Sequence, residues 1–201
     1  SSLELEADIS NLLCNGDSTG SIQLIITQGA EPVTFNWSGP NDYSATGANI
    51  ENLASGDYNL MAEDANGCQT EVVYTVNEPD SLVIKPLQSP LNDNGFNLSG
   101  FQAGDGQILE PQVNGGTIPY AFLWGSDGGY SSQDGNNQNN LDAGSYFLIV
   151  TDANLCTDSI SIVLTEPIPV EIPNGISPNG DGFNDGFTVR GIDGFPRNKL
   201  L

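Results

Sequence analysis

The chain has no histidine, and its four lysines and arginines stand against 26 aspartates and glutamates. Without an imidazole it cannot form a His-based catalytic triad or most types of zinc site. The formal net charge of −22 repels phosphate backbones and anionic lipid, which disfavours nucleic-acid binding and direct membrane insertion. Such acidity suits either the binding of divalent cations or simple dispersal in water, and both explanations stay open.

Long apolar runs are missing as well. No stretch of about 18 apolar residues occurs, and the N-terminal residues show no basic segment followed by an apolar core, so no membrane span or signal peptide is predicted. The sequence opens on alternating Leu3, Leu5 and Ala7, which predict a strand already under way, and stops at Leu200-Leu201. We therefore expect both ends to be cuts in a longer polypeptide.

Catalytic motifs are equally scarce. No Gly-rich loop is followed by a lysine, which argues against nucleotide phosphate chemistry. A pair of carboxylates could serve a glycosidase, but most acidic residues here occupy turns, where Asp is favoured by its local hydrogen bonding. We predict that the chain is not an enzyme.

An internal repeat is the most informative feature that is present. Residues 52–79 and 140–167 share the pattern NLxxGxYxLxxxDANxC at an offset of 88 residues, and both end in Glu-Pro. Upstream, PVTFNW and PYAFLW match at an offset of 87. Such small drifts indicate loop insertions in a constant framework, so we predict modules at residues 1–79 and 80–167 and a separate segment at 168–201. A tandem array favours spacing or multivalent contact over catalysis.

Short segments rich in branched and aromatic residues, separated by Gly, Asn, Asp and Pro, predict strands. We expect strands at residues 21–27, 33–37, 57–63, 71–76, 82–85, 107–113, 120–124, 146–151 and 159–164. No window shows a convincing capped helix. The expected fold class is all-β: two tandem immunoglobulin-like sandwiches followed by the first strands of a small β domain.

Two aromatic positions in each module are predicted to belong to the core. Trp37 and Trp124 alternate with Phe along a strand, which favours core packing over the alternative, a platform on which sugars stack. Tyr58 and Tyr146 lie in a Gly-x-Tyr corner, where the ring is buried and the hydroxyl bonds to nearby backbone.

The three cysteines allow one disulfide. Cys68 and Cys156 are equivalent in the repeat, but the counterpart of Cys14 falls near Gly100 to Gln102. We predict a Cys14–Cys68 disulfide that closes a loop of 54 residues, worth roughly 4 kcal/mol on the chain-entropy model, in an oxidising compartment. Two buried thiols are the alternative. Cys156 would be a small core side chain or a free thiol, and the shortage of positive charge favours the core role.

The segment IPNGISPNGDGFNDGFTV at residues 172–189 suggests a cation site. Asn179, Asp181 and Asp185 place side-chain oxygens at intervals around glycines, and the carbonyl of Phe183 could add a further oxygen, as in a tight loop around calcium. The alternative is a connector made of several turns.

These motifs resemble two known families. The NGDSTGSI opening at residues 15–22 and the blocks GDYNLMAEDANGC and GSYFLIVTDANLC are similar to SprB repeats, the extracellular repeats of very large gliding adhesins. SPNGDGFNDGF, followed by Pro196–Leu201, resembles the start of the gliding-motility-associated C-terminal domain, the type B sorting signal of the type IX secretion system. The second module departs from the repeat pattern by lacking the early cysteine, and the C-terminal domain stops after its first strands.

The resemblance implies an adhesin exported by the type IX secretion system and displayed on the cell surface, attached to the bacterial outer membrane, where it contributes to gliding. Its partners would be the type IX translocon and a PorP/SprF-like outer-membrane barrel protein. Asp-Ser-x triplets at residues 17–19, 80–82 and 158–160 resemble the O-glycosylation sites of such proteins, whereas the Asn-x-Ser sequons at Asn36 and Asn97 are weaker.

We expect the repeats to act as a semi-rigid spacer, stiffened at the Glu78-Pro79 and Glu166-Pro167 junctions. The alternative is a carbohydrate-binding module array of a secreted polysaccharide-degrading protein, in which loops 38–51 and 125–139 contact polysaccharide.

Overall fold

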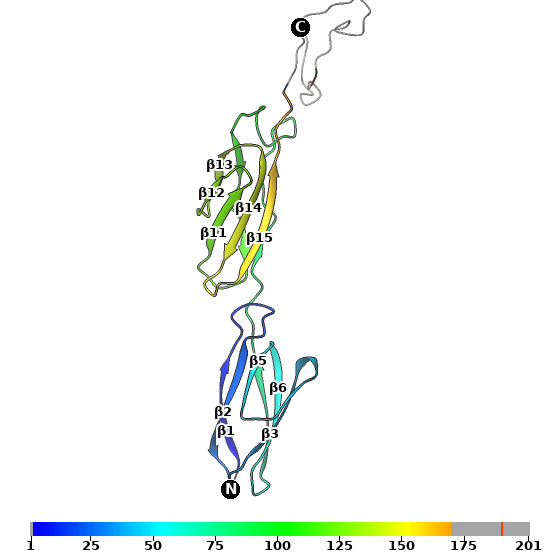
Figure 1. Cartoon of the computed structure of the whole chain (residues 1–201), viewed down its shortest axis with the longest axis vertical. Helices are drawn as coiled ribbons and strands as arrows, with labels where there is room; N and C mark the ends of the chain where they lie inside the picture. Colours follow the sequence, from blue (N-terminus) through cyan, green and yellow to red (C-terminus); the bar gives the residue numbers. More distant parts are fainter. Residues whose placement is uncertain (1, 170–189, 191–201) are drawn as a thin grey trace, which may run out of the picture. The chain divides into compact units, whose positions relative to one another are not determined.

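The computed structural model describes residues 2–169 and Arg190, which fall into two compact units. Unit 1 comprises Ser1–Val83, Asn114–Tyr120 and Thr151–Thr157, and unit 2 comprises Ile84–Val113, Ala121–Val150 and the described part of Asp158–Leu201. Almost all of the regular structure is strand (Figure 1). No helix among the described residues is long and apolar enough to cross a membrane.

The elements are β1 (Glu4–Ser10), β2 (Gly20–Gln28), β3 (Thr34–Gly39), the 3₁₀ helix η1 (Pro40–Asp42), β4 (Tyr43–Ala45), β5 (Asn49–Leu53), β6 (Gly56–Glu63), β7 (Gln69–Val76), β8 (Val83–Ile84), β9 (Gly106–Ile108), β10 (Val113–Asn114), β11 (Ala121–Ser126), β12 (Ser131–Ser132), β13 (Gln138–Leu141), β14 (Gly144–Thr151) and β15 (Thr157–Leu164).

Unit 1 contains a three-stranded sheet in the order β1-β2-β5 and a four-stranded sheet in the order β4-β3-β6-β7. Alternate residues of β6 are buried, because successive side chains of a strand point to opposite faces of its sheet. The buried residues of β6 pack with Ile22 and Leu24 of β2 in one hydrophobic core between the two sheets. Unit 1 is thus an antiparallel sandwich.

The other large sheet, in the order β12-β11-β14-β15, belongs mainly to unit 2. Figure 1 shows β11, β14 and β15 side by side. A two-stranded sheet of β13 and β9 contributes Ile108 and Leu141 to the buried residues, and β14 contributes Leu148 and Val150. The predicted all-β, immunoglobulin-like fold class is confirmed for the described chain. The predicted first strands of a small C-terminal β domain lie outside the described residues.

Both tryptophans lie in the interior. Trp37 is 3% exposed and Trp124 is 1% exposed. Trp37 Nε1 donates to the Gly47 carbonyl oxygen at 2.9 Å, and Trp124 Nε1 donates to that of Asp134 at 3.0 Å. A buried ring with its only polar atom already bonded to backbone cannot serve as a platform for sugar.

The two Gly-x-Tyr corners have the same geometry. The hydroxyl of Tyr58 donates to the carbonyl oxygen of Ala54, and the hydroxyl of Tyr146 donates to that of Asp142, both at 3.0 Å. Both rings are buried, so each tyrosine ties the turn before its strand to the core.

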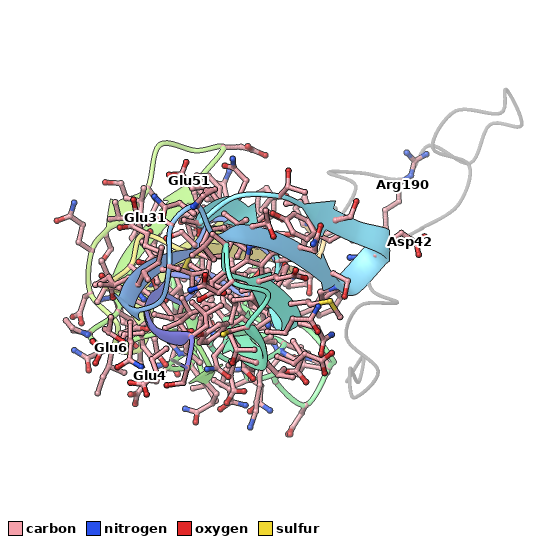
Figure 2. All side chains as sticks on the ribbon, turned by 90° about the horizontal axis from the view of Figure 1, so that it is seen from below. Glu4, Glu6, Glu31, Asp42, Glu51 and Arg190 are labelled. Atoms are coloured by element: carbon pink, nitrogen blue, oxygen red, sulfur yellow. A yellow bond between two sulfur atoms is a disulfide. The ribbon has the colours of Figure 1, made fainter. Side chains whose placement is uncertain are left out.

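Carboxylates project from the surface of unit 1, as Figure 2 shows for Glu4, Glu6, Glu31 and Glu51. Glu4, Glu6 and Asp8 occupy alternate exposed positions on β1, which lies at the edge of its sheet. Charges on an edge strand discourage pairing with a strand of another molecule. Part of the acidity therefore has a structural role.

Candidate functional site

The Asp-Ala-Asn-x-Cys pattern forms a turn centred on a buried aspartate. In the first repeat, Asp64 Oδ1 accepts the N–H groups of Asn66 and Cys68, each at 2.9 Å. Its Oδ2 accepts the N–H of Ala30 at 3.1 Å. Asp64 thus joins the β6–β7 turn to the segment between β2 and β3. Asp is favoured here because its short side chain can accept several nearby N–H groups.

The second repeat builds the same turn around Asp152. Asp152 Oδ1 accepts the N–H groups of Asn154 and Cys156, each at 2.9 Å, and its Oδ2 accepts the N–H of Thr117 at 2.8 Å. Ala153 N–H also donates to the Thr117 carbonyl oxygen. The repeated sequence thus encodes a repeated hydrogen-bond set.

Both aspartates have a lowered pKa. For Asp64 the largest cause is the Cys68 N–H, followed by the Ala30 N–H; burial opposes them, and the Asn66 N–H and Cys68 thiol add smaller contributions. For Asp152 burial is the largest single influence and raises the pKa, but the N–H groups of Thr117, Cys156 and Asn154 together outweigh it. Both carboxylates therefore remain charged near neutral pH and act as structural acceptors.

A disulfide joins Cys14 to Cys156, with an S–S distance of 2.02 Å and a sequence separation of 142 residues. Cys156 lies in the Thr151–Thr157 segment of unit 1. Beside it, Asn154 Nδ2 donates to the Leu13 carbonyl oxygen at 3.1 Å and to Thr117 Oγ1 at 3.0 Å. The Asp152 turn thus receives the Leu13-Cys14 segment by one covalent bond and one hydrogen bond.

The predicted Cys14–Cys68 disulfide is therefore wrong, as is the predicted core role of Cys156. Leu12 N–H donates to the Asn77 carbonyl oxygen, which places this segment at the C-terminal end of β7, whereas Cys68 lies just before its N-terminal end. At about 3.3 Å per residue, a strand of this length spans roughly 26 Å. A disulfide tolerates a Cα separation of only about 7 Å.

One residue of the Asp152 turn, to which the Leu13-Cys14 segment is bonded, has an energetically costly backbone conformation. Leu155 has φ of 69° and is 80% exposed, whereas its counterpart Gly67 has φ of 77°. Only glycine adopts this region without a steric penalty from Cβ. The second repeat thus carries an exposed apolar side chain next to the disulfide, at a position where the first repeat has glycine.

The Glu-Pro junctions hold the opening segment of each repeat. Glu78 Oε2 accepts the N–H of Gly16 at 2.7 Å, and Glu166 Oε2 accepts the N–H of Gln102 at 2.6 Å. These glutamates therefore bind backbone besides preceding a proline. Their recurrence in the sequence was the available signal for this role.

No group of three or more His, Cys, Asp or Glu residues suited to a metal occurs in the described part of the chain. The predicted calcium ligands, Asn179, Asp181, Phe183 and Asp185, lie outside the described residues. The serines of the three Asp-Ser-x triplets, Ser18, Ser81 and Ser159, are all exposed.

The outer face of the β4-β3-β6-β7 sheet carries a depression of about 580 Å³. Its polar lining includes Asn36, Ser38, Asn59 and Glu71. At the positions equivalent to the two asparagines, the second repeat has Leu123 and Phe147. The second repeat therefore does not share the two amide side chains that line this depression.

The comparison with protein families places the first repeat. Residues 7–42 match the family model described as SprB repeat. The match runs from β1 through η1, so the first sandwich includes an SprB-like repeat. Among curated proteins, none matches this chain in sequence.

Three solved structures are similar to the chain. The C-terminal 282-residue fragment of intimin in complex with the translocated intimin receptor (Tir) intimin-binding domain has 16% identity and a TM-score of 0.41, with 82% of this chain and 64% of that chain covered. DIP-gamma IG1+IG2 has 11% identity and a TM-score of 0.40, with coverages of 83% and 98%. Dpr2 Ig1-Ig2 in complex with DIP-Theta Ig1-Ig3 has 10% identity and a TM-score of 0.34, with coverages of 86% and 69%. The chain thus spans less than two thirds of the intimin fragment.

Proposed function

We propose that this chain is a non-enzymatic, load-bearing part of an extracellular cell-surface adhesin. The observation that carries the proposal is the SprB match at residues 7–42 within a duplicated sandwich. The repeated tryptophans, tyrosines and aspartates are all used inside the fold or its turns. The residues that the two copies share therefore have structural roles, as expected of repeats that act as a spacer.

The covalent structure suits mechanical work. Tension applied to the two ends of the polypeptide enters through β1, passes from Cys14 to Cys156, and leaves through β15. The residues enclosed by the disulfide cannot be extended by that tension. Such a shortcut is useful to a surface protein that is pulled while it is attached.

We further propose that the type IX secretion system exports the protein and that it contributes to gliding. In this proposal, residues 1–79 and 80–167 are the repeats, and residues 168–201 form a sorting and anchoring segment. A PorP/SprF-like barrel would hold that segment at the outer membrane, and calcium would bind at Asn179, Asp181, Phe183 and Asp185. The support is the sequence resemblance of the two regions and the SprB match.

Surface display tests the export proposal. The 201-residue chain, carrying an epitope tag, would be produced behind a secretion signal in a gliding bacterium with a type IX system, with and without residues 168–201. We expect antibody labelling of intact cells to require this segment and to be lost in a translocon mutant. Equal labelling of both chains would contradict the sorting role.

A thermal melt of the full chain with and without a calcium chelator tests the calcium site. An unchanged melting temperature would contradict it.

The second candidate, a carbohydrate-binding module, is favoured by the amide-lined depression on the first repeat. A glycan array separates it from the spacer. A pure spacer returns no hits. Specific binding that Asn59→Ala abolishes would support the carbohydrate function instead.

A further inference from the structure

The turn that receives the Leu13-Cys14 segment has a structural twin in the first repeat. In both turns, an aspartate accepts the N–H two residues later and the N–H of the cysteine four residues later. Ala65 N–H donates to the Ala30 carbonyl oxygen, as Ala153 N–H donates to that of Thr117. The backbone that presents Cys68 is therefore held in the same way as the backbone that presents Cys156.

The two turns also present similar surfaces. Cys68 and Cys156 are both half-buried. Asn66, the counterpart of the asparagine that donates to Leu13, is exposed. The Cys68 thiol donates a hydrogen bond to the Asp64 carboxylate, so its sulfur lies at the same turn. An asparagine amide and a cysteine sulfur at this spacing are what hold the Leu13-Cys14 segment on the second repeat.

We propose that the Asp64–Cys68 turn is a covalent docking site for the Leu-Cys segment of another SprB-like repeat that precedes it in the same polypeptide. The proposal rests on the spacer function and deepens it by naming a partner. The direction follows from the described disulfide, in which Cys14 of the repeat nearer the N-terminus bonds to Cys156 of the repeat that follows. Cys68, the equivalent of Cys156, takes its partner from the N-terminal side.

The register of the opening segments shows where such a series of crosslinks stops. Asn11 Oδ1 accepts the N–H of Asn77, and Asn97 Oδ1 accepts the N–H of Thr165, each at 2.8 Å. This fixes an offset of 86, at which the equivalent of Cys14 is Gly100. The second repeat can receive a segment from the preceding repeat but cannot form the same crosslink to whatever follows it.

The crosslink is an oxidation of two thiols. Two S–H bonds break and one S–S bond forms, while two electrons and two protons pass to a disulfide oxidant that becomes two thiols. The hydrogen bond from the Cys68 thiol to Asp64 is lost, but the backbone N–H bonds to Asp64 do not depend on the thiol hydrogen.

The test is the 201-residue chain extended by a second copy of residues 1–79 placed ahead of Ser1. Leu3 and Leu82 are both buried and each approaches an equivalent glycine, Gly29 or Gly116. The new Pro79–Ser1 junction therefore reproduces the natural Pro79–Asp80 junction. After oxidation by a glutathione redox buffer, non-reducing peptide mass mapping should find Cys14–Cys156 and, in addition, the inserted Cys14 bonded to the original Cys68.

The matched control carries Cys68→Ser at the original position. It should keep Cys14–Cys156 and leave the inserted Cys14 open to a thiol reagent. Three outcomes would each overturn the proposal. The inserted Cys14 could pair with the inserted Cys68, or the original Cys68 could crosslink two chains. The third is an original Cys68 that stays reduced although Cys14–Cys156 has formed. These outcomes leave the surface-display result untouched, so failure of the docking site and failure of the spacer function are separable.

A second measurement uses the unextended 201-residue chain. It tests the docking site even if the extended chain misfolds. A synthetic peptide of residues 10–17, activated at its cysteine as a thiopyridyl mixed disulfide, is mixed with the 201-residue protein. Attack by Cys68 forms the peptide–protein disulfide and releases thiopyridone. We expect a rate several-fold above that of a scrambled peptide. Equal rates would overturn the docking site.

Discussion

Reduction of the Cys14–Cys156 disulfide should change the length of chain that force can extend. The enclosed segment has a sequence separation of 142 residues. At about 3.3 to 3.6 Å per extended residue, it holds roughly 470 to 510 Å of contour length. With the disulfide intact, only the segments outside it can lengthen. After reduction, the whole hidden length should be released.

Single-molecule force spectroscopy on the 201-residue chain, held by handles at its two ends, measures this directly. Traces in oxidising buffer should stop short of the fully extended length by about 500 Å, and a phosphine reductant should restore it. The variant C14S/C156S should behave like the reduced protein in both buffers, while C68S should retain the difference.

The size of the difference discriminates between disulfides. A Cys14–Cys68 pairing encloses only 54 residues and would hide roughly 180 to 195 Å. A measured difference near that value, or no difference at all, would refute the pairing described here and the load path built on it. The chain-entropy model also assigns the longer loop about 5 kcal/mol, so the reduced protein should unfold at lower denaturant concentration.

Three further changes test the parts of the fold that the two repeats share. Tyr58→Phe removes the hydroxyl bonded to Ala54 and should lower the free energy of unfolding by about 1 kcal/mol in urea titration; an unchanged midpoint would contradict the corner role. Leu155→Gly should stabilise the protein by up to about 1 kcal/mol by relieving its positive φ, and the reciprocal Gly67→Leu should destabilise it; effects of the same sign would contradict this. Because the pKa of Asp152 is lowered, its contribution is complete above the ordinary value of 3.8 and is lost as the pH falls through the lower folded value. Asp152→Asn should therefore flatten the acid limb of the stability profile, and an unaltered limb would argue against the carboxylate's role.

The sequence was sufficient where hydrophobic alternation is strong. The segment predicted at 57–63 is β6, and that at 71–76 lies within β7. One predicted strand, 107–113, is two short strands, β9 and β10, because Pro111 between them has no N–H to donate to a ladder. Apolar periodicity does not register such a break.

Two of the strands that were missed are polar. No strand was predicted at β5 (NIENL) or at β13 (QNNL), because Asn and Glu are depleted in strands. Each is extended because it pairs with a strand distant in sequence: β5 with β2, and β13 with β9. Two buried residues at fixed spacing in each, Ile50 and Leu53 in β5 and Gln138 and Leu141 in β13, were the only local sign.

The disulfide was mispredicted because each copy of the repeat was treated as self-contained. Matching Cys68 to Cys156 was correct as a register, but pairing Cys14 within its own copy assumed that the sandwich brings its early and late loops together. The length of β7 forbids this, and strand length was already visible in the sequence. A cysteine at one end of a strand cannot form a disulfide with another cysteine just beyond its opposite end. For Cys14 that partner is the equivalent of Cys68 in the next copy.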